Sequence, residues 1–268
     1  MPELPDVEGF KRVLAKNALR KTIDRVVVSD ARILGKLPVG KFASSLEGAQ
    51  LVAARRHGKH LMANIDRGQW LTLHFGPAGG LQFVGKPGGE PPFTRVRFDF
   101  AGDGSLAYTN RRMIGRVGLA EDAADFIAEE KLGPDALDRR FDFDALKTAV
   151  LSLKRDVKSV LMDQQVIAGI GNIYSDEILF QARINPVERV DKLSPAELKR
   201  LFTEMRKVLE TAVDRRAGSE QFLERLPKGY LLPERKRGGH CPRCGSVLKV
   251  LKIGGRTGYC CPRCQQGC

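Results

Sequence analysis

The six cysteines of this chain all lie within its last 28 residues. Two Cys-x2-Cys pairs, Cys241 with Cys244 and Cys261 with Cys264, are separated by 16 residues. This spacing is typical of a tetrahedral zinc site with four thiolate ligands, whereas the cysteines of a disulfide framework are spread through a domain. Because four protein ligands leave no position open for water, we predict one structural Zn²⁺ ion whose binding folds the tail. A coincidental cluster of cysteines is the alternative interpretation.

Two cysteines, Cys260 and Cys268, are surplus to this set of ligands. Cys260 competes with Cys261 as a ligand, but only Cys261 completes the second Cys-x2-Cys pair. The same tail is basic, because residues 225–264 contain ten lysines and arginines and one acid, Glu234. Such a surface attracts phosphates, although a run of charges that contacts only solvent has the same composition.

The excess of basic residues extends to the whole chain, which has a formal net charge of +13 and a sequence pI of about 9.7. This charge indicates a polyanionic partner, with nucleic acid as the first choice and ribosomal surfaces and anionic lipid as alternatives. No run approaches the roughly 18 apolar residues of a membrane span, and no signal-peptide pattern begins the chain. We therefore expect an intracellular protein that binds nucleic acid and has no membrane role, and we expect a monomer.

The chain begins with a proline and an acid side by side, Pro2 and Glu3. A small residue at position two permits removal of Met1, which would leave Pro2 as a terminal secondary amine. Such an amine attacks an electrophilic sugar carbon and forms an iminium, as lysine does in Schiff-base catalysis. The carboxyl group of Glu3 would transfer protons during the reaction. The alternative is that these residues only begin a helix, where proline and acids are favoured.

Periodicity divides the chain into a β-rich part and a helical part. Apolar residues at helical spacing predict a helix over residues 5–17, and residues 22–118 contain short runs typical of strands. Several such runs, separated by glycine and proline, predict a sandwich or a barrel. The predicted strands are residues 22–29, 60–66, 69–75, 94–100 and 105–109.

The strongest helix signal covers residues 195–213. Ser194 is the predicted cap, Pro195 is the first helical residue, and Glu197 stands three residues after the cap, which is the pattern of a capping box. Apolar residues at helical spacing predict one buried stripe along this helix. The stripe consists of Leu198, Leu201, Phe202, Met205, Val208, Leu209 and Ala212.

Residues 163–180 contain two apolar helical segments around the sequence Ala168-Gly169-Ile170-Gly171-Asn172. The glycines allow tight turns that expose the backbone. Free N–H groups at the start of the second segment, together with the Asn172 side-chain amide, would hold a phosphate. The alternative is an ordinary helix–turn–helix corner that ends at a glycine.

In order along nearly the whole chain, these features resemble the formamidopyrimidine-DNA glycosylase and endonuclease VIII family of bifunctional base-excision enzymes. Each motif is weak alone, and the resemblance rests on their joint occurrence. The motifs are residues 1–5, Arg56–His60, Leu73–Gly76, Tyr108–Arg112, Leu132–Pro134, the helix–two-turn–helix from Gln165 to Phe180, and the finger with Gly255-Arg256-Thr257.

The resemblance implies an α+β multidomain fold with DNA lying in the cleft between domains. A β-sandwich with a leading helix would cover residues 1–131, and a helical domain with the helix–two-turn–helix would cover residues 132–236. The boundary lies at a linker that begins with Leu132-Gly133-Pro134. A four-cysteine zinc finger would cover residues 237–268, and no redox cofactor is required.

The resemblance also implies the roles of individual residues in a DNA glycosylase that cleaves abasic sites. Pro2 would be the nucleophile at C1′ of an everted nucleotide, Glu3 the proton-transfer partner, and Lys59 a basic residue near the damaged base. Asn172 and Arg256 would bind phosphates that flank the lesion. The remaining DNA-contact positions of the family fall on His74, Pro77, Arg112 and Ile114.

The chain departs from the family pattern at several substrate-contact positions. Asp6 replaces a glutamate, Asn110-Arg111 replaces Asp-Pro, and Pro77 replaces a methionine that fills the gap in the duplex. The Arg-x-Phe wedge is Arg112-Met113-Ile114 here, which keeps the arginine and loses the aromatic ring. The base-capping segment, residues 217–222, also differs. These departures affect the identity of the lesion more than the class of reaction.

Two classes of function therefore remain open from the sequence. The first is a DNA glycosylase with lyase activity on oxidised bases or abasic sites. The second is a DNA-binding protein on the same scaffold that recognises lesions without excising them, or that retains only lyase activity. Retention of Pro2, Glu3 and Lys59 favours the enzyme, whereas the altered wedge and cap keep the second class open.

Overall fold

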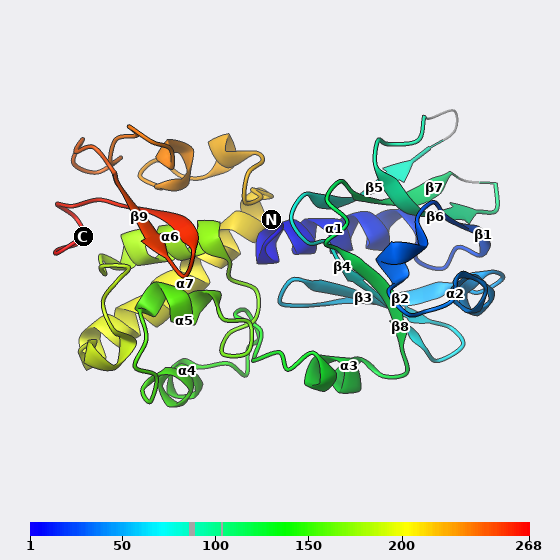
Figure 1. Ribbon diagram of the computed structural model, residues 1–268, viewed down its shortest axis with the longest axis horizontal. Helices are drawn as coiled ribbons and strands as arrows, with labels where there is room; N and C mark the ends of the chain where they lie inside the picture. Colours follow the sequence, from blue (N-terminus) through cyan, green and yellow to red (C-terminus); the bar gives the residue numbers. More distant parts are fainter. Residues whose placement is uncertain (86–88, 103) are drawn as a thin grey trace. The chain divides into compact units, whose positions relative to one another are not determined.

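A computed structural model describes residues 1–85, 89–102 and 104–268 (Figure 1). The chain forms two compact units, of which the first comprises residues 1–2 and 6–130 and the second comprises residues 3–5 and 131–268. The short segment of residues 3–5 thus belongs to the second unit, although the chain on either side of it belongs to the first. In the described part of the chain, no helix has the length and apolar character needed to cross a membrane.

The first unit contains two antiparallel four-stranded sheets (Figure 1). One sheet has the strand order β1-β6-β7-β5, and the other has the order β2-β3-β4-β8. The predicted β-sandwich is therefore confirmed. The strands are β1 (Ile23–Val28), β2 (Leu51–His57), β3 (His60–Ile65), β4 (Trp70–His74), β5 (Gly79–Val84), β6 (Thr94–Phe100), β7 (Ser105–Asn110) and β8 (Arg116–Ala120).

The core of the first unit lies between its sheets, because one cluster of buried side chains includes Leu73 from β4 and Phe98 from β6. The helices of this unit are α1 (Leu4–Asn17), apart from its first two residues, α2 (Val39–Leu46), α3 (Ala123–Glu129) and the short 3-10 helix η1 (Ala31–Leu34). Val7 of α1 joins the same cluster, and the ring of Phe42 in α2 lies 6.3 Å from that of Phe98. Each such side chain stabilises the fold by roughly 1.5–3 kcal/mol when it is fully buried.

The five predicted strands correspond to β1, β3, β4, β6 and β7, each within one residue at either end. Strand β6 alternates buried and half-buried residues along its whole length, which makes its pattern readable in the sequence. Strands β2, β5 and β8 are not predicted. The register of β2 shifts between Leu51 and Ala53, and β5 begins with Gly79 and Gly80, so neither strand shows a clean alternation.

The second unit is helical, with a β-hairpin near its end. Its helices are α4 (Phe143–Val150), α5 (Val157–Met162), α6 (Asn172–Ala182), α7 (Pro195–Arg215) and the 3-10 helices η2 (Val190–Lys192), η3 (Leu223–Arg225) and η4 (Leu232–Glu234). The capping box of α7 is confirmed, because Ser194 Oγ accepts from the Glu197 N–H at 3.3 Å and Glu197 Oε2 accepts from the Ser194 N–H at 2.9 Å. Phe202 is only half-buried, and its ring lies 6.4 Å from that of Phe141.

The hairpin consists of β9 (Lys249–Ile253) and β10 (Arg256–Cys260). Gly254 and Gly255 connect the strands with φ angles of +56° and +72°, and both positions of a type I′ turn need such left-handed angles. Phe180 of α6 belongs to one buried cluster with Cys241 and Cys261. The finger therefore packs on α6 within the second unit.

Candidate active site and nucleic-acid interface

The carboxylate of Glu3 is buried in the second unit, at the start of α6. It accepts hydrogen bonds from the backbone N–H groups of Gly171 at 2.8 Å, Ile173 at 2.8 Å and Tyr174 at 3.1 Å. The first turn of a helix has unpaired N–H groups and a partial positive charge, so a carboxylate is favoured there. The residue that follows the predicted nucleophile is thereby fixed to α6.

These contacts correct one prediction from the sequence, that the N–H groups at the start of α6 are free to bind a phosphate. The N–H groups of Gly171, Ile173 and Tyr174 bind Glu3 of this chain instead. Position 171 has no room for a side chain, because a Cβ there would lie 2.5 Å from the Glu3 carboxylate. The prediction that remains for this end of α6 is a phosphate contact from the side chain of Asn172.

The side chain of Asn172 contacts the hairpin of the finger. Its Nδ2 donates to the backbone oxygen of Thr257 at 2.9 Å, next to the predicted phosphate ligand Arg256. An amide nitrogen carries two N–H groups, so one remains for a phosphate oxygen. The Oδ1 atom is buried and has no hydrogen-bond partner among the described residues, which is uncommon for a buried polar atom.

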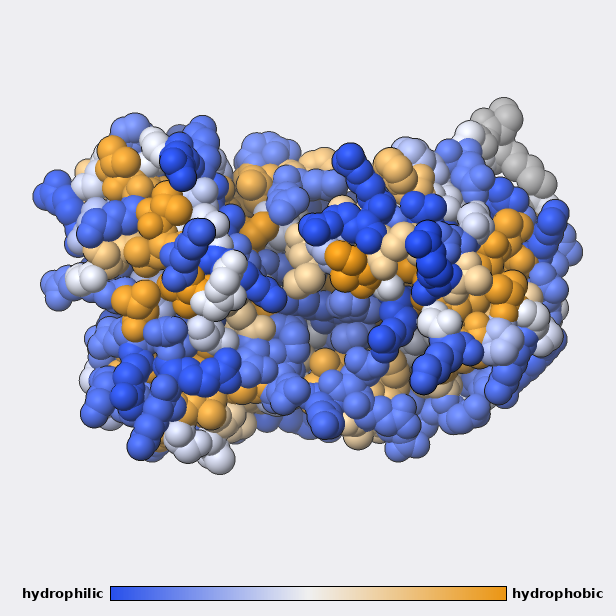
Figure 2. Space-filling model, viewed as in Figure 1, coloured by the Kyte–Doolittle hydropathy of each residue, from blue (hydrophilic) through white to orange (hydrophobic). Residues whose placement is uncertain are grey.

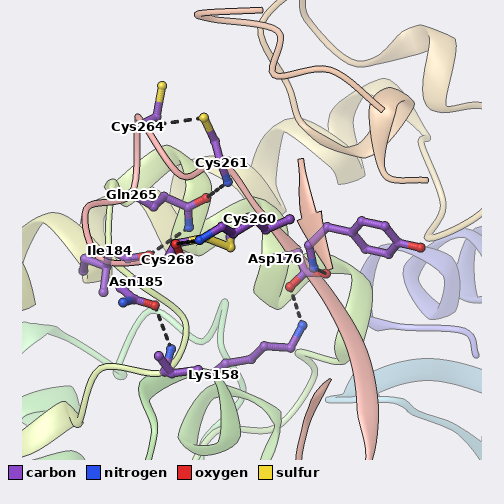
Figure 3. Close-up of a disulfide and its surroundings, with 12 residues drawn as sticks. Lys158, Asp176, Ile184, Asn185, Cys260, Cys261, Cys264, Gln265 and Cys268 are labelled. Atoms are coloured by element: carbon purple, nitrogen blue, oxygen red, sulfur yellow. Dashed lines mark hydrogen bonds and ion pairs between the residues drawn. A yellow bond between two sulfur atoms is a disulfide. The ribbon is translucent and has the colours of Figure 1, made fainter. Parts of the chain in front are cut away.

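One turn further along α6, Asp176 joins the helix to the hairpin through a buried ionic network that the sequence analysis missed. Lys158 Nζ of α5 donates to Asp176 Oδ1, and the two side chains are fully buried (Figure 3). Arg235 Nε donates to Asp176 Oδ2 at 2.8 Å, and the backbone N–H of Tyr259 in β10 donates to the same oxygen at 3.1 Å. Burial lowers the pKa of Lys158, and the adjacent Asp176 opposes that shift.

The same network holds the two predicted phosphate ligands near one another. Lys158 Nζ also donates to the backbone oxygen of Asn172 at 3.2 Å, and Arg235 donates to that of Thr257 at 3.0 Å. Arg256 itself is exposed at the start of β10. A charged residue within an apolar helical run, as Asp176 is in α6, is the sequence signal that would have indicated this network.

The four predicted zinc ligands, Cys241, Cys244, Cys261 and Cys264, come together, with their sulfur atoms all within 4.8 Å of one another. The Cys241–Cys264 and Cys244–Cys261 sulfur pairs are 3.8 Å and 3.5 Å apart. Zn–S bonds of about 2.3 Å in a tetrahedron require sulfur separations of roughly 3.8 Å, so the four thiolates fit one zinc ion. The backbone N–H of Cys264 also donates to Cys261 Sγ at 3.4 Å, which orients that ligand.

The two surplus cysteines form a disulfide with each other, so Cys260 does not compete for the metal (Figure 3). Their Cα atoms are 6.4 Å apart, within the usual range for a disulfide. Gln265, which lies between these two cysteines in the sequence, is buried. Its Oε1 accepts from the Cys261 N–H at 2.9 Å, and its Nε2 donates to the backbone oxygen of Ile184 at 2.8 Å. The end of the chain is thus attached to the region after α6.

In the first unit, Asn110 holds together the two loops that carry Pro77 and Ile114. Its fully buried side chain donates from Nδ2 to the backbone oxygen of Phe75 at 2.7 Å, and its Oδ1 accepts from the Ile114 N–H at 3.3 Å. An aspartate, the usual residue of the family here, only accepts and would repel the Phe75 oxygen. The loops approach so closely that a Cβ on Gly76 would lie 2.7 Å from the Ile114 backbone.

The predicted wedge residues are accessible on these loops. Ile114 is 54% exposed, Arg112 is exposed, and Pro77 is half-buried. Met113 has a φ of +52°, a left-handed conformation that is uncommon for a residue with a large side chain. Arg112 and Ile114 are therefore available to a DNA duplex.

Lys59 lies in the tight turn between β2 and β3 and is only 4% exposed. Gly58 before it has a φ of +56°, as the first central residue of a type II′ hairpin requires. The ring of His60 stacks on that of His74 at 4.8 Å. Burial lowers the pKa of His60 to about 3 and that of His74 to about 4, and the charge of Lys59 adds to both shifts. Both imidazoles are therefore neutral near pH 7.

Pro2 is half-buried and directly precedes Glu3, which is held by α6. Met1 stands before it, so its nitrogen becomes an amine only when Met1 is removed. The structure thus places Glu3, Asn172 and Arg256 in the second unit, and Pro2 and Lys59 in the first.

Three family models match consecutive parts of this chain. The formamidopyrimidine-DNA glycosylase N-terminal domain matches residues 1–117, the formamidopyrimidine-DNA glycosylase H2TH domain matches residues 132–223, and the zinc finger found in FPG and IleRS matches residues 238–267. A formamidopyrimidine-DNA glycosylase of Carboxydothermus hydrogenoformans is 35% identical, covering 99% of this chain and 100% of the relative. Another from Arabidopsis thaliana is 31% identical, covering 99% of this chain and 71% of the relative.

Solved structures of similar proteins include complexes with damaged DNA. The Lactococcus lactis formamidopyrimidine-DNA glycosylase bound non-covalently to DNA with an abasic site has a TM-score of 0.88 and 26% identity, covering 98% of this chain and 99% of that one. A mutant of the Lactococcus lactis protein with DNA containing Fapy-dG has a TM-score of 0.89 and 26% identity, covering 99% of this chain and 100% of that one. These similarities extend over both units and the finger.

Proposed function

This chain belongs to the formamidopyrimidine-DNA glycosylase family, and from that membership we propose that it is a bifunctional DNA glycosylase and abasic-site lyase of base excision repair. Its partner is damaged DNA, and its cofactor is one structural zinc ion in the finger. We propose that it acts inside the cell, where its substrate is, and as a monomer, because all proposed site residues come from one chain.

The observation that carries this proposal is the anchoring of Glu3. Three backbone N–H groups at the start of α6 hold its carboxylate, and Pro2 is its covalent neighbour. Because Pro2 and Glu3 are consecutive residues, the terminal amine and the carboxyl group lie close together. The carboxyl group is fixed to the start of α6, the helix that also presents Asn172. A general acid or base is effective only when it is positioned on the reacting group.

The proposed reaction requires a chain from which Met1 has been removed. The unprotonated amine of Pro2 attacks C1′ of the everted nucleotide and gives up its N–H proton, the bond from C1′ to the base breaks, and the base leaves with a proton. The bond from C1′ to the ring oxygen then breaks, the oxygen takes a proton, and the nitrogen lone pair completes an iminium. Loss of a proton from C2′ expels the 3′ phosphate. Glu3 donates and accepts these protons.

The other proposed site residues bind the DNA. Asn172 and Arg256 contact phosphates that flank the lesion, and the network of Asp176 keeps them in register. Lys59 stabilises negative charge near the damaged base, and its burial in a rigid turn fixes its position. The remaining contacts come from residues of the first unit: His74, Pro77, Arg112 and Ile114.

Borohydride trapping on an oligonucleotide with an abasic site tests the proposed nucleophile, because the iminium is reduced to a stable protein–DNA bond. Mature wild-type protein should be trapped, and Pro2→Gly should bind the same DNA but lose most of the trapping. A peptide tag fused in front of Pro2 keeps its nitrogen in a peptide bond, so the tagged protein should not cleave the DNA. Cleavage that survives the tag would show that Pro2 is not the nucleophile.

A second candidate function, recognition of lesions without excision or with lyase activity only, is favoured by one observation. The exposed residue at the wedge is Ile114, which lacks an aromatic ring. A panel of duplexes with 8-oxoguanine, formamidopyrimidine and abasic sites separates the candidates, because the enzyme releases the damaged bases whereas a binding protein only retains the duplex.

A further inference from the structure

The surface shown in Figure 2 is mostly hydrophilic, but several large apolar side chains are exposed on the protein. Phe93, immediately before β6, is one of these, with 48% of its surface exposed. Its φ angle is +64°, a conformation that is unfavourable for a bulky residue. Burial in a core therefore does not account for the ring, and its backbone is held in a costly conformation.

The backbone of Phe93 is fixed by the residue that organises the wedge loops. The N–H of Asn110 donates to the Phe93 carbonyl oxygen at 2.9 Å, while the side chain of Asn110 binds the backbone of Phe75 and Ile114. The guanidinium of Arg111 lies 5.6 Å from the centre of the Phe93 ring. Phe93 is thus joined through one buried residue, Asn110, to the loops that carry Pro77 and Ile114.

Backbone strain is concentrated in the same place. Among the described residues of the first unit, the non-glycine residues with positive φ are Arg20, Ala78, Phe93 and Met113. Ala78 lies in the loop after Pro77 and Met113 precedes Ile114, so all but Arg20 belong to the segments joined by Asn110. Strained conformations persist where the surrounding structure enforces them, and they cluster at binding sites.

We infer that Phe93 supplies the aromatic surface that the wedge itself lacks, by stacking on the base that is left exposed when the damaged nucleotide leaves the duplex. This inference rests on the proposed function. Stacking on a base needs a rigid, exposed ring, and the fixed backbone of Phe93 provides one. The charge of Arg111 beside the ring favours the approach of the phosphate backbone. Phe93 is therefore a specificity-determining residue for paired lesions.

The test uses a signal that does not depend on catalysis. A duplex carries a tetrahydrofuran abasic analogue, which the protein cannot cleave, with 2-aminopurine opposite to it, and stacking quenches the fluorescence of that base. Wild type and Phe93→Tyr should quench the signal on binding, whereas Phe93→Ala and Phe93→Leu should bind with at least about half of the quenching lost. Val39→Ala is the matched control, because Val39 is also exposed, at 40%, in the same unit.

Single-turnover rates on cleavable DNA give the second measurement. Stacking on one base is worth about 1–3 kcal/mol, so Phe93→Ala should slow excision of a formamidopyrimidine paired with cytosine by roughly ten- to hundredfold relative to cleavage of an abasic site. Unchanged quenching in Phe93→Ala, or equal loss on both substrates, would overturn the inference. Wild-type protein that cleaves neither substrate would refute the proposed function instead, and the quenching would still decide the role of Phe93.

Discussion

The carboxylate of Glu3 lies 2.8 Å from the backbone nitrogen of Gly171, although 168 residues separate the two in the chain. The contact is reinforced by the neighbouring residue, because the Leu4 N–H donates to the Gly169 carbonyl oxygen at 3.0 Å. The helix that follows the glycine-rich turn therefore begins on a side chain from the N-terminus. This contact places Glu3, the proposed acid, next to Asn172, the proposed phosphate ligand.

The absence of a side chain at position 171 is needed for this contact. A Cβ there would lie 2.5 Å from the Glu3 carboxylate, so Gly171→Ala should displace Glu3 and leave buried N–H groups unpaired. Each unpaired buried donor costs about 1–3 kcal/mol. We expect a lower midpoint of urea unfolding and at least about a tenfold loss of trapping at abasic sites. Gly40→Ala is the control, because a Cβ at Gly40 meets nothing within 4 Å. Equal behaviour of the two variants would contradict the role of the contact.

Local signals in the sequence were sufficient for several elements. The capping box of Ser194 and Glu197 depends on residues three apart, and the zinc ligands depend on two Cys-x2-Cys pairs. Strand β6 shows its burial as a simple alternation. In each case the physical cause lies within a few residues, so the sequence alone predicts the structure.

The rest depends on residues that are distant in the chain. Nothing near Asp176 indicates that Lys158 and Arg235 will share its carboxylate, and nothing near Asn110 indicates that it will bind Phe75. The free N–H groups expected at the start of α6 are a reasonable inference from a helix alone. They are occupied because a distant carboxylate arrives there, which only the tertiary fold determines.

The buried network predicts a strong effect of Asp176→Asn. The substitution leaves the fully buried Lys158 without its counter-ion, and breaking such a pair costs about 3–5 kcal/mol. We expect a correspondingly lower free energy of unfolding in urea and weaker binding to DNA with an abasic-site analogue, because the ionic link between α6 and the hairpin is weakened. Asp191→Asn, which breaks a surface pair with Arg189, should change neither quantity appreciably. Similar losses in both variants would show that burial of the pair is unimportant.

Burial raises the pKa of Glu177 to about 7, above its ordinary value of 4.5. Between these values the folded protein keeps a proton that the unfolded chain releases, so the contribution of Glu177 to stability falls as the pH rises from 4.5 to 7. Glu177→Gln removes this dependence and retains an acceptor for the Leu232 N–H. Relative to wild type, the variant should gain about 3 kcal/mol over that range. Urea unfolding of both proteins at several pH values measures the difference between their free energies of unfolding. The titration of the histidines contributes equally to both proteins and drops out of this difference. Parallel stability curves would contradict the prediction.

The exposed guanidinium of Arg256 should act as a phosphate ligand of the finger. Arg256→Ala should weaken binding to all DNA sequences and reduce the slope of log affinity against log salt by about one unit, because one fewer counterion is released. Arg140→Ala, which removes an exposed arginine paired with Asp138, is the control and should leave the slope unchanged. Removal of zinc by a chelator should unfold the finger and reduce the slope further. An unchanged slope for Arg256→Ala would exclude this contact.

The last prediction concerns the residue at the wedge. Extrusion of a paired base costs a few kcal/mol, and side chains inserted into the gap recover part of that cost. Pro77 is short and rigid, and Ile114 has no ring. The stacking that we infer for Phe93 replaces these lost contacts only in part, so we expect wild-type protein to process abasic sites and mismatched lesions much better than 8-oxoguanine paired with cytosine. Ile114→Phe adds a ring at a position that is 54% exposed, and stacking worth about 1–3 kcal/mol should raise excision of the paired lesion roughly tenfold or more.

The same substitution should restore excision in Phe93→Ala if the two rings serve one purpose. Single-turnover rates on both substrates measure the ratio. Equally fast processing of both substrates by wild type would contradict the prediction, and so would a ratio that Ile114→Phe leaves unchanged.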